Sequence, residues 1–207
     1  MLAFLLTAVL ISLSGVMAPG PITTAALAAG ARRRHAGLLI AVGHAVVELP
    51  LMLMLLAGRV HFFTGTSVRI GIALAGGVVL IVMGISRLRS LFAEEANSSS
   101  AVEGHPLITG IVLTAANPYF LLWWGTVGMT LATKAMTWGL AFLGLFALVH
   151  WLCDLIWLDF LSLAGWKGTQ WFGPNAQRVV SGICGVVLVG FGARFLWGVQ
   201  GMSWVGN

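Results

Sequence analysis

Six apolar stretches, each long enough to cross a lipid bilayer, constrain the fold of this chain more than any other feature. A membrane-spanning helix needs about 20 apolar residues. The stretches are continuous and lack the alternation typical of barrel strands. The sequence therefore predicts an all-α integral membrane protein with six transmembrane helices. These cover about residues 2–29, 35–57, 66–88, 106–131, 138–163 and 178–199 of the 207.

Composition supports this prediction. Charged residues make up 8% of the chain and hydrophobic residues 59%, whereas soluble domains carry about 25% charged residues. The first stretch resembles a secretory signal peptide, but no Lys or Arg precedes it and Pro19 directly follows Ala18. We therefore expect it to be the first span. The net charge of +5 comes from residues at span ends, so the lipid bilayer, and no nucleic acid, is the expected partner.

The distribution of Lys and Arg predicts the orientation of the chain. The side richer in these residues faces the cytoplasm. Both termini should then lie outside. The predicted cytoplasmic side carries Arg32, Arg33, Arg34, Arg87, Arg89, Lys167 and Arg178, and the other side carries Arg59, Arg69, Lys134 and Arg194.

A polar stretch divides the chain into two halves. Residues 92–105 contain three glutamates and three consecutive serines, the composition of a linker. We predict a first three-helix repeat over residues 1–91, a polar cytoplasmic linker over 92–105 and a second three-helix repeat over 106–207. Together the repeats form one membrane domain.

Matching segments recur in the two halves. Ala18-Pro19-Gly20 aligns with Ala116-Asn117-Pro118 at an offset of 98, and His44 and Glu48 align with His150 and Asp154 at 106. The apolar segments Gly77–Leu80 and Gly185–Leu188 align at 108. Each half has an odd number of spans, so the second half must enter the membrane from the opposite side. The sequence thus predicts a 3+3 inverted-topology repeat.

Proline interrupts the first and fourth spans at corresponding places. A proline removes a backbone donor and clashes with the preceding turn, so it breaks a helix. Irregular backbone within a membrane is tolerated where it lines a cavity, and half-helix ends can bind charged substrate groups there. We therefore expect substrate at the two breaks, formed by Pro19, Gly20 and Pro21 and by Asn117, Pro118 and Tyr119.

Two histidine–carboxylate pairs lie inside spans: His44 with Glu48, and His150 with Asp154. A four-residue step places both side chains on one helix face, and ionisable residues at membrane depth are functional candidates. The pairs could carry protons or contact substrate, since imidazole titrates near neutral pH. They could also form interhelical hydrogen bonds alone, or bind a divalent metal such as Zn²⁺ or Mn²⁺.

The arrangement of these features resembles the LysE/RhtB amino-acid exporters along the whole chain. The shared features are Pro19-Gly20-Pro21 in the first span, a basic loop, the polar linker and Asn117-Pro118 opening the second half. Two positions differ from the common family pattern, with Ile22 in place of an acidic residue and Tyr119 in place of a lysine. The resemblance implies a proton-driven bacterial or archaeal inner-membrane carrier that exports amino acids or related metabolites.

The residues leave other functions open. Trp123 and Trp124 could face lipid or form a cavity wall. Cys153 and Cys184 lie in spans without CxxC spacing and are expected to be buried side chains; a membrane thiol-redox carrier is the alternative. A non-transporting membrane scaffold would need the polar residues only as interhelical contacts. Glycines in the third and sixth spans permit a homodimer.

The working hypothesis is therefore a secondary active transporter rather than an enzyme, because no nucleophile motif, P-loop or dinucleotide fingerprint is present. Glu48 and Asp154 would carry the proton, assisted by His44 and His150. We expect no cofactor. A divalent metal-ion exporter that uses the same four side chains is the main alternative.

Overall fold

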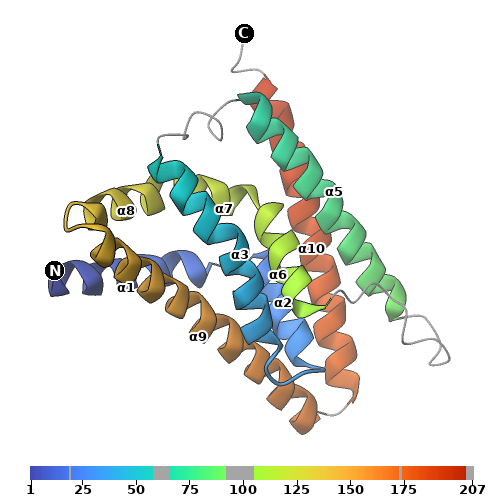
Figure 1. Cartoon of the computed structure of the whole chain (residues 1–207). Coiled ribbons are helices and arrows are strands. Elements are labelled where there is room, and N and C mark those ends of the chain that lie inside the picture. The colour runs from blue at the N-terminus through green and yellow to red at the C-terminus, as the bar shows by residue number, and fades with distance from the viewer. Residues whose placement is uncertain (19, 58–65, 92–104, 173, 204–207) are drawn as a thin grey trace.

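All the regular structure that the computed structural model describes is helical (Figure 1). The structure describes residues 1–18, 20–57, 66–91, 105–172 and 174–203. Most of the predicted linker, 92–104, and Pro19 therefore lie outside the described residues. The helices are α1 (Leu2–Val16), α2 (Pro21–Gly30), α3 (Ala36–Leu56), α5 (Thr66–Ser90), α6 (Pro106–Ala115), α7 (Pro118–Trp123), the π-helical turn η2 (Trp124–Gly128), α8 (Met129–Met136), α9 (Leu140–Phe172) and α10 (Pro174–Ser203).

The first and fourth apolar stretches are broken where the prolines predict it. Helices α1 and α2 are bent by 78°, and α6 and the Pro118–Met136 segment by 60°. Gly20 and Asn117 adopt extended backbone at the breaks, and each precedes a proline in the first turn of the next helix. The Asn117 side chain accepts a hydrogen bond of 3.1 Å from the Tyr119 amide, which caps α7.

Up to five helical units of the described residues are long and apolar enough to cross a membrane. Three are single helices, namely α3, α9 and the 178–199 part of α10, and two are the bent pairs. The third stretch forms α5, whose apolar part Ile70–Ser86 is shorter than a full span. The predicted count of six transmembrane helices thus stays a prediction.

Two predicted boundaries are wrong. The segment expected to connect the fifth and sixth spans is helical up to Phe172, so α9 continues nine residues beyond the expected end of the fifth span at Leu163. Gly165 lets this extension approach α2, since a Cβ there would overlap Leu27 O. The fourth span also continues past Leu131, to Met136. Packing against neighbouring helices therefore prolongs both helices beyond what composition indicates.

Glycines allow α5 and α10 to pack closely and antiparallel (Figure 1). A Cβ added at Gly77 would lie 3.0 Å from Gly192 O, and one at Gly192 would lie 2.6 Å from Gly77 O. Gly84 and Gly185 are related in the same way, at 2.7 and 3.1 Å. These glycines make contacts within one chain, as small residues do between membrane helices. Gly71 of α5 differs, because a Cβ added there would meet nothing within 4 Å.

A second set of glycines brings α2, α3 and α9 together. A Cβ at Gly30 would overlap the backbone of Ser162, and one at Gly37 would overlap Leu158 O. The Ser162 hydroxyl, which is fully buried, donates to the carbonyls of Arg33 and Arg34 at 3.3 and 3.0 Å. These contacts hold α9 against α3. The two histidine–carboxylate pairs lie on these two helices, one pair on each.

Candidate functional site

The structure brings the two predicted histidine–carboxylate pairs into one cluster. Glu48 Oε1 lies 3.2 Å from His44 Nε2 and 3.1 Å from His150 Nε2. Asp154 contributes one oxygen 3.7 Å from His44 Nε2 and the other 3.7 Å from His150 Nε2. All four residues are at least nine-tenths buried. Each half of the chain therefore supplies one histidine and one carboxylate to a single buried site, which we call the His–acid cluster.

A hydroxyl from the other half of the chain holds His44. Thr114, at the end of α6, donates its hydroxyl hydrogen to Gly110 O at 2.6 Å. A hydroxyl has one hydrogen to donate, so Thr114 Oγ1 accepts the 2.9 Å hydrogen bond from His44 Nδ1. A neutral His44 would then present a lone pair from Nε2 to the carboxylate of Glu48. Because two lone pairs repel, a proton or another cation must occupy this contact.

His150, in the second half of the chain, has the equivalent contact with a hydroxyl from the first half. Its Nδ1 lies 2.7 Å from the hydroxyl of Ser12, which is near the end of α1. Unlike Thr114, Ser12 can either donate or accept here, so His150 can place a hydrogen on Nε2 and donate to Glu48 while neutral. The two imidazoles thus differ in how they can hold a proton, although both point Nε2 toward Glu48 Oε1.

Glu48 Oε1 is the central acceptor of the cluster. Besides the two imidazoles, the indole of Trp124 donates to it at 3.0 Å. Trp124 is 1% exposed, and it belongs to the π-helical turn, a feature common at functional sites. Three donors on one oxygen favour the ionised carboxylate, because charge-assisted hydrogen bonds are roughly twice as strong as neutral ones.

Asp154 is less well bonded than Glu48. Its Oδ2 is buried and has no hydrogen-bond partner among the described residues. An unsatisfied buried acceptor costs about 1–3 kcal/mol, and more when it is charged. Asp154 is therefore the carboxylate with capacity left for an additional donor.

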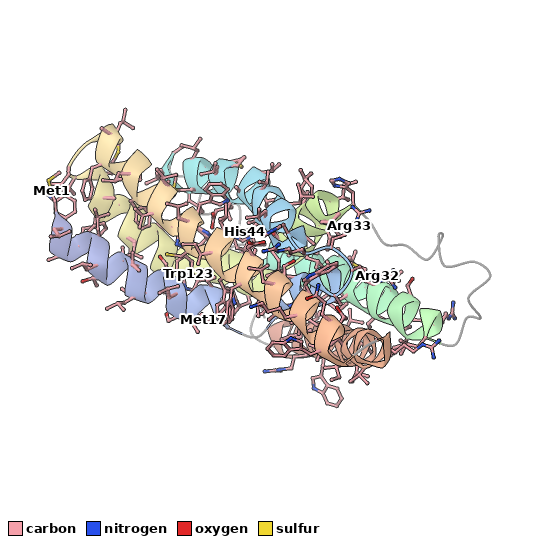
Figure 2. All side chains as sticks on the ribbon, turned by 90° about the horizontal axis from the view of Figure 1, so that it is seen from below. Met1, Met17, Arg32, Arg33, His44 and Trp123 are labelled. Carbon is pink, nitrogen blue, oxygen red and sulfur yellow. The ribbon has the colours of Figure 1, made fainter. Side chains whose placement is uncertain are left out.

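The His–acid cluster forms part of the wall of a cavity of about 570 Å³. All four of its residues line this cavity, together with the predicted break residues Gly20, Pro21, Asn117, Pro118 and Tyr119. Figure 2 places His44 and Trp123 between the end that carries Met1 and the region of Arg32 and Arg33. The structure thus joins the two groups of site residues predicted separately, apart from Pro19, which lies outside the described residues.

Trp123 and Trp124 are cavity-wall residues. Trp123 stacks on His150 with ring centroids 5.2 Å apart, and Trp124 meets the same ring edge-on at 5.4 Å. Both line the cavity. The two indole rings therefore hold the His150 ring from its face and from its edge.

Other singled-out residues lie outside the cluster. Asp159 of α9 accepts from Nδ1 of His35, the residue before α3, at 3.2 Å. Cys153 and Cys184 are buried free cysteines. The thiol of Cys153 donates to Val149 O, and that of Cys184 to Thr24 O.

The cluster also has the ligand types of a divalent metal site. One atom from each of His44, Glu48 and Asp154 lies within 4.8 Å of the other two. The hydrogen bond from Nδ1 of His44 to Thr114 leaves Nε2 directed into the cluster, as second-shell contacts of metal-binding histidines do. These three residues could therefore hold a metal cation where the proton would otherwise lie.

Sequence reasoning missed Ser12, Thr114 and Arg194, which also line the cavity. Ser12 and Thr114 are 102 residues apart, between the offsets of 98 and 106 that relate neighbouring segments of the halves. This offset between two hydroxyl residues could have indicated Ser12 and Thr114 as a further matched pair of site residues. No sequence feature indicated Arg194 as a site residue, because a single arginine near the end of a span is typical of the membrane–water interface.

We expect Thr114→Val to destabilise the protein, because the hydrogen on His44 Nδ1 loses its acceptor in a buried position. The loss should be about 1–3 kcal/mol in the free energy of unfolding, measured by thermal unfolding in detergent. Thr130→Val, at an exposed position on α8, is the matched control and should change stability by less than about 0.5 kcal/mol. Equal stability of the two variants would contradict the role of Thr114.

Comparison with known proteins identifies one family. The family model described as LysE type translocator matches residues 13–198, which include both helix breaks and the whole His–acid cluster. No curated protein and no solved structure matches the chain.

Proposed function

Because this chain belongs to the LysE type translocator family and is thus a multi-pass membrane transporter, we propose that it exports an amino acid or a related small metabolite in exchange for protons. The supporting observation is the His–acid cluster in the wall of a cavity that reaches both helix breaks. The proposed location is the inner membrane of a bacterium or archaeon, with both termini outside. A homodimer is compatible with this function but not required by it.

The proposed architecture is a 3+3 inverted repeat with its site between the halves. Residues that contact one another across α5 and α10 support it. A Cβ at Gly77 would meet the Leu196 side chain at 2.9 Å, and one at Gly185 would meet that of Leu88 at 2.8 Å. Gly185 is offset by 108 from Gly77, and Leu196 is offset by 108 from Leu88. The second contact is therefore the first one with the two halves of the chain exchanged. A pseudo-two-fold axis would produce this exchange.

The same exchange relates the contacts of the two histidines. His44 of the first half binds Thr114 of the second, and His150 of the second half binds Ser12 of the first. An axis that relates the halves would therefore pass near Glu48 and Asp154. Binding sites of inverted-repeat transporters lie at such a repeat interface, which supports the cluster as the coupling site.

In the proposed mechanism, Glu48 and His44 hold the transported proton at the contact between Oε1 and Nε2. The chain places this pair beside the substrate cavity, so the proton and the substrate can influence each other directly. The half-helix starting at Pro21 presents its first amide groups at the cavity wall, where they would bind a substrate carboxylate. The residues around Asn117 and Pro118 would complete the site.

A divalent metal is the second candidate substrate, because ligand atoms of His44, Glu48 and Asp154 lie close enough to share an ion. This alternative predicts that purified protein binds Zn²⁺ or Mn²⁺ in a one-to-one ratio and that His44→Ala removes the ion. It also predicts metal flux without any dependence on amino acids.

Proteoliposomes with an imposed pH gradient test the proposal. We expect the reconstituted protein to move a radiolabelled amino acid against its gradient when the pH gradient is present, and to stop when a protonophore collapses it. Metal flux in place of amino-acid flux would favour the second candidate. Absence of flux for every solute would contradict both.

A further inference from the structure

We infer that the cavity selects an α-amino acid with a large, apolar and uncharged side chain. This inference rests on the proposed exporter function and adds the substrate class. It follows from counting which charged groups in the cavity wall remain available to a substrate.

The first available group is the carboxylate of Asp154. Its side chain is 8% exposed and lines the cavity, and its Oδ2 has no hydrogen-bond partner. An ammonium group that reaches this carboxylate from the cavity would offer three donors to it. Glu48 is not equivalent, because its Oε1 already accepts from two imidazoles and an indole. Asp154 is thus the acceptor for the substrate ammonium.

The second available group is the guanidinium of Arg194, which lines the same cavity from α10. It forms no ion pair with a carboxylate among the residues that the structure describes. Asp154 and Arg194 belong to different helices, α9 and α10, which meet near their connection and separate away from it (Figure 1). A guanidinium binds a carboxylate through two parallel hydrogen bonds. Arg194 therefore suits the same substrate carboxylate as the first amide groups of α2, which line this cavity too.

With the substrate ammonium at Asp154 and the substrate carboxylate at Arg194, no charged side chain of the cavity wall remains for another charged group. The other charged or titratable residues of the His–acid cluster are bonded to one another. The rest of the wall is largely apolar, with Ile22, Ala73, Leu158, Phe191 and Phe195 among its residues. A third charge on the substrate would lie against this apolar wall without a partner, which is costly. An apolar side chain would instead be stabilised by this wall.

Ligand titrations of the purified full-length protein test the inference. We would follow tryptophan fluorescence and thermal unfolding with L-leucine, L-phenylalanine, L-lysine and L-glutamate. Leucine and phenylalanine should bind, with lysine and glutamate at least about 10-fold weaker. Arg194→Gln and Asp154→Asn should each weaken binding of the apolar amino acids about 10- to 100-fold, as expected for a lost charged hydrogen bond.

Two variants provide matched controls. Arg178→Gln removes a cation from the same helix as Arg194, and Asp159→Asn removes a carboxylate from the same helix as Asp154, and neither residue lines the cavity. Both should bind leucine like the wild type. Tighter binding of lysine or glutamate than of leucine, or unchanged leucine affinity in Arg194→Gln, would overturn the inference and leave amino-acid export standing. Failure of the export function would appear differently, as absence of binding by all four amino acids.

Discussion

Glu48→Gln should lose proton-coupled transport by about 100-fold or more while remaining folded, because it removes the charge at the centre of the site. Glutamine keeps the length of the side chain, and its amide oxygen can still accept from Trp124. When that oxygen takes the position of Oε1 it also accepts from His150, whereas the contact with His44 Nε2 still needs a hydrogen on that nitrogen. The variant therefore keeps two of the three hydrogen bonds at Oε1, and its side chain can neither take up nor release a proton.

The measurement is uptake driven by a pH gradient in proteoliposomes, compared with exchange of substrate in the absence of a gradient. If Glu48 couples proton movement to substrate transport, the pH gradient should no longer stimulate uptake by Glu48→Gln, even where this variant still exchanges substrate. Asp159→Asn is the control, since Asp159 pairs with His35 outside the cluster, and it should respond to the gradient as the wild type does. Full stimulation of Glu48→Gln would show that the proton is carried elsewhere.

The second large effect is expected at Gly165, where the backbone of α9 meets that of α2. A Cβ at this position would overlap Leu27 O and lie 3.0 Å from the amide of Ala31. Gly165→Ala should therefore separate the two helices and lower the free energy of unfolding by about 1–3 kcal/mol. Thermal unfolding in detergent measures this loss.

Gly168 provides an internal control three residues further along the same helix. A Cβ there meets nothing within 4 Å, so Gly168→Ala should stabilise α9 by about 0.5–1 kcal/mol, because alanine favours a helix more than glycine. Opposite signs for the two substitutions would confirm that close helix packing, rather than helix propensity, requires Gly165. A Gly165→Ala variant as stable as the wild type would show that α2 and α9 can move apart with little loss in the free energy of unfolding.

Local sequence features were sufficient to predict several parts of the structure. The prolines at positions 21 and 118 predicted the two breaks, because a proline blocks helix continuation whatever surrounds it. The apolar runs predicted the helices, and the four-residue spacing placed His44 with Glu48 on one face. The end of α9 could not be predicted in this way, since contacts with α2 rather than composition carry the helix to Phe172.

The sequence by itself determined that the chain is helical and apolar, where its helices break, and which ionisable residues it places inside them. These properties depend on backbone chemistry and on the polarity of each segment. Only the tertiary structure decided that the two pairs meet at Glu48 Oε1, that Ser12 and Thr114 orient the histidines, and that Arg194 faces the same cavity. Such contacts join residues about 70 to 140 positions apart, so helix packing sets them.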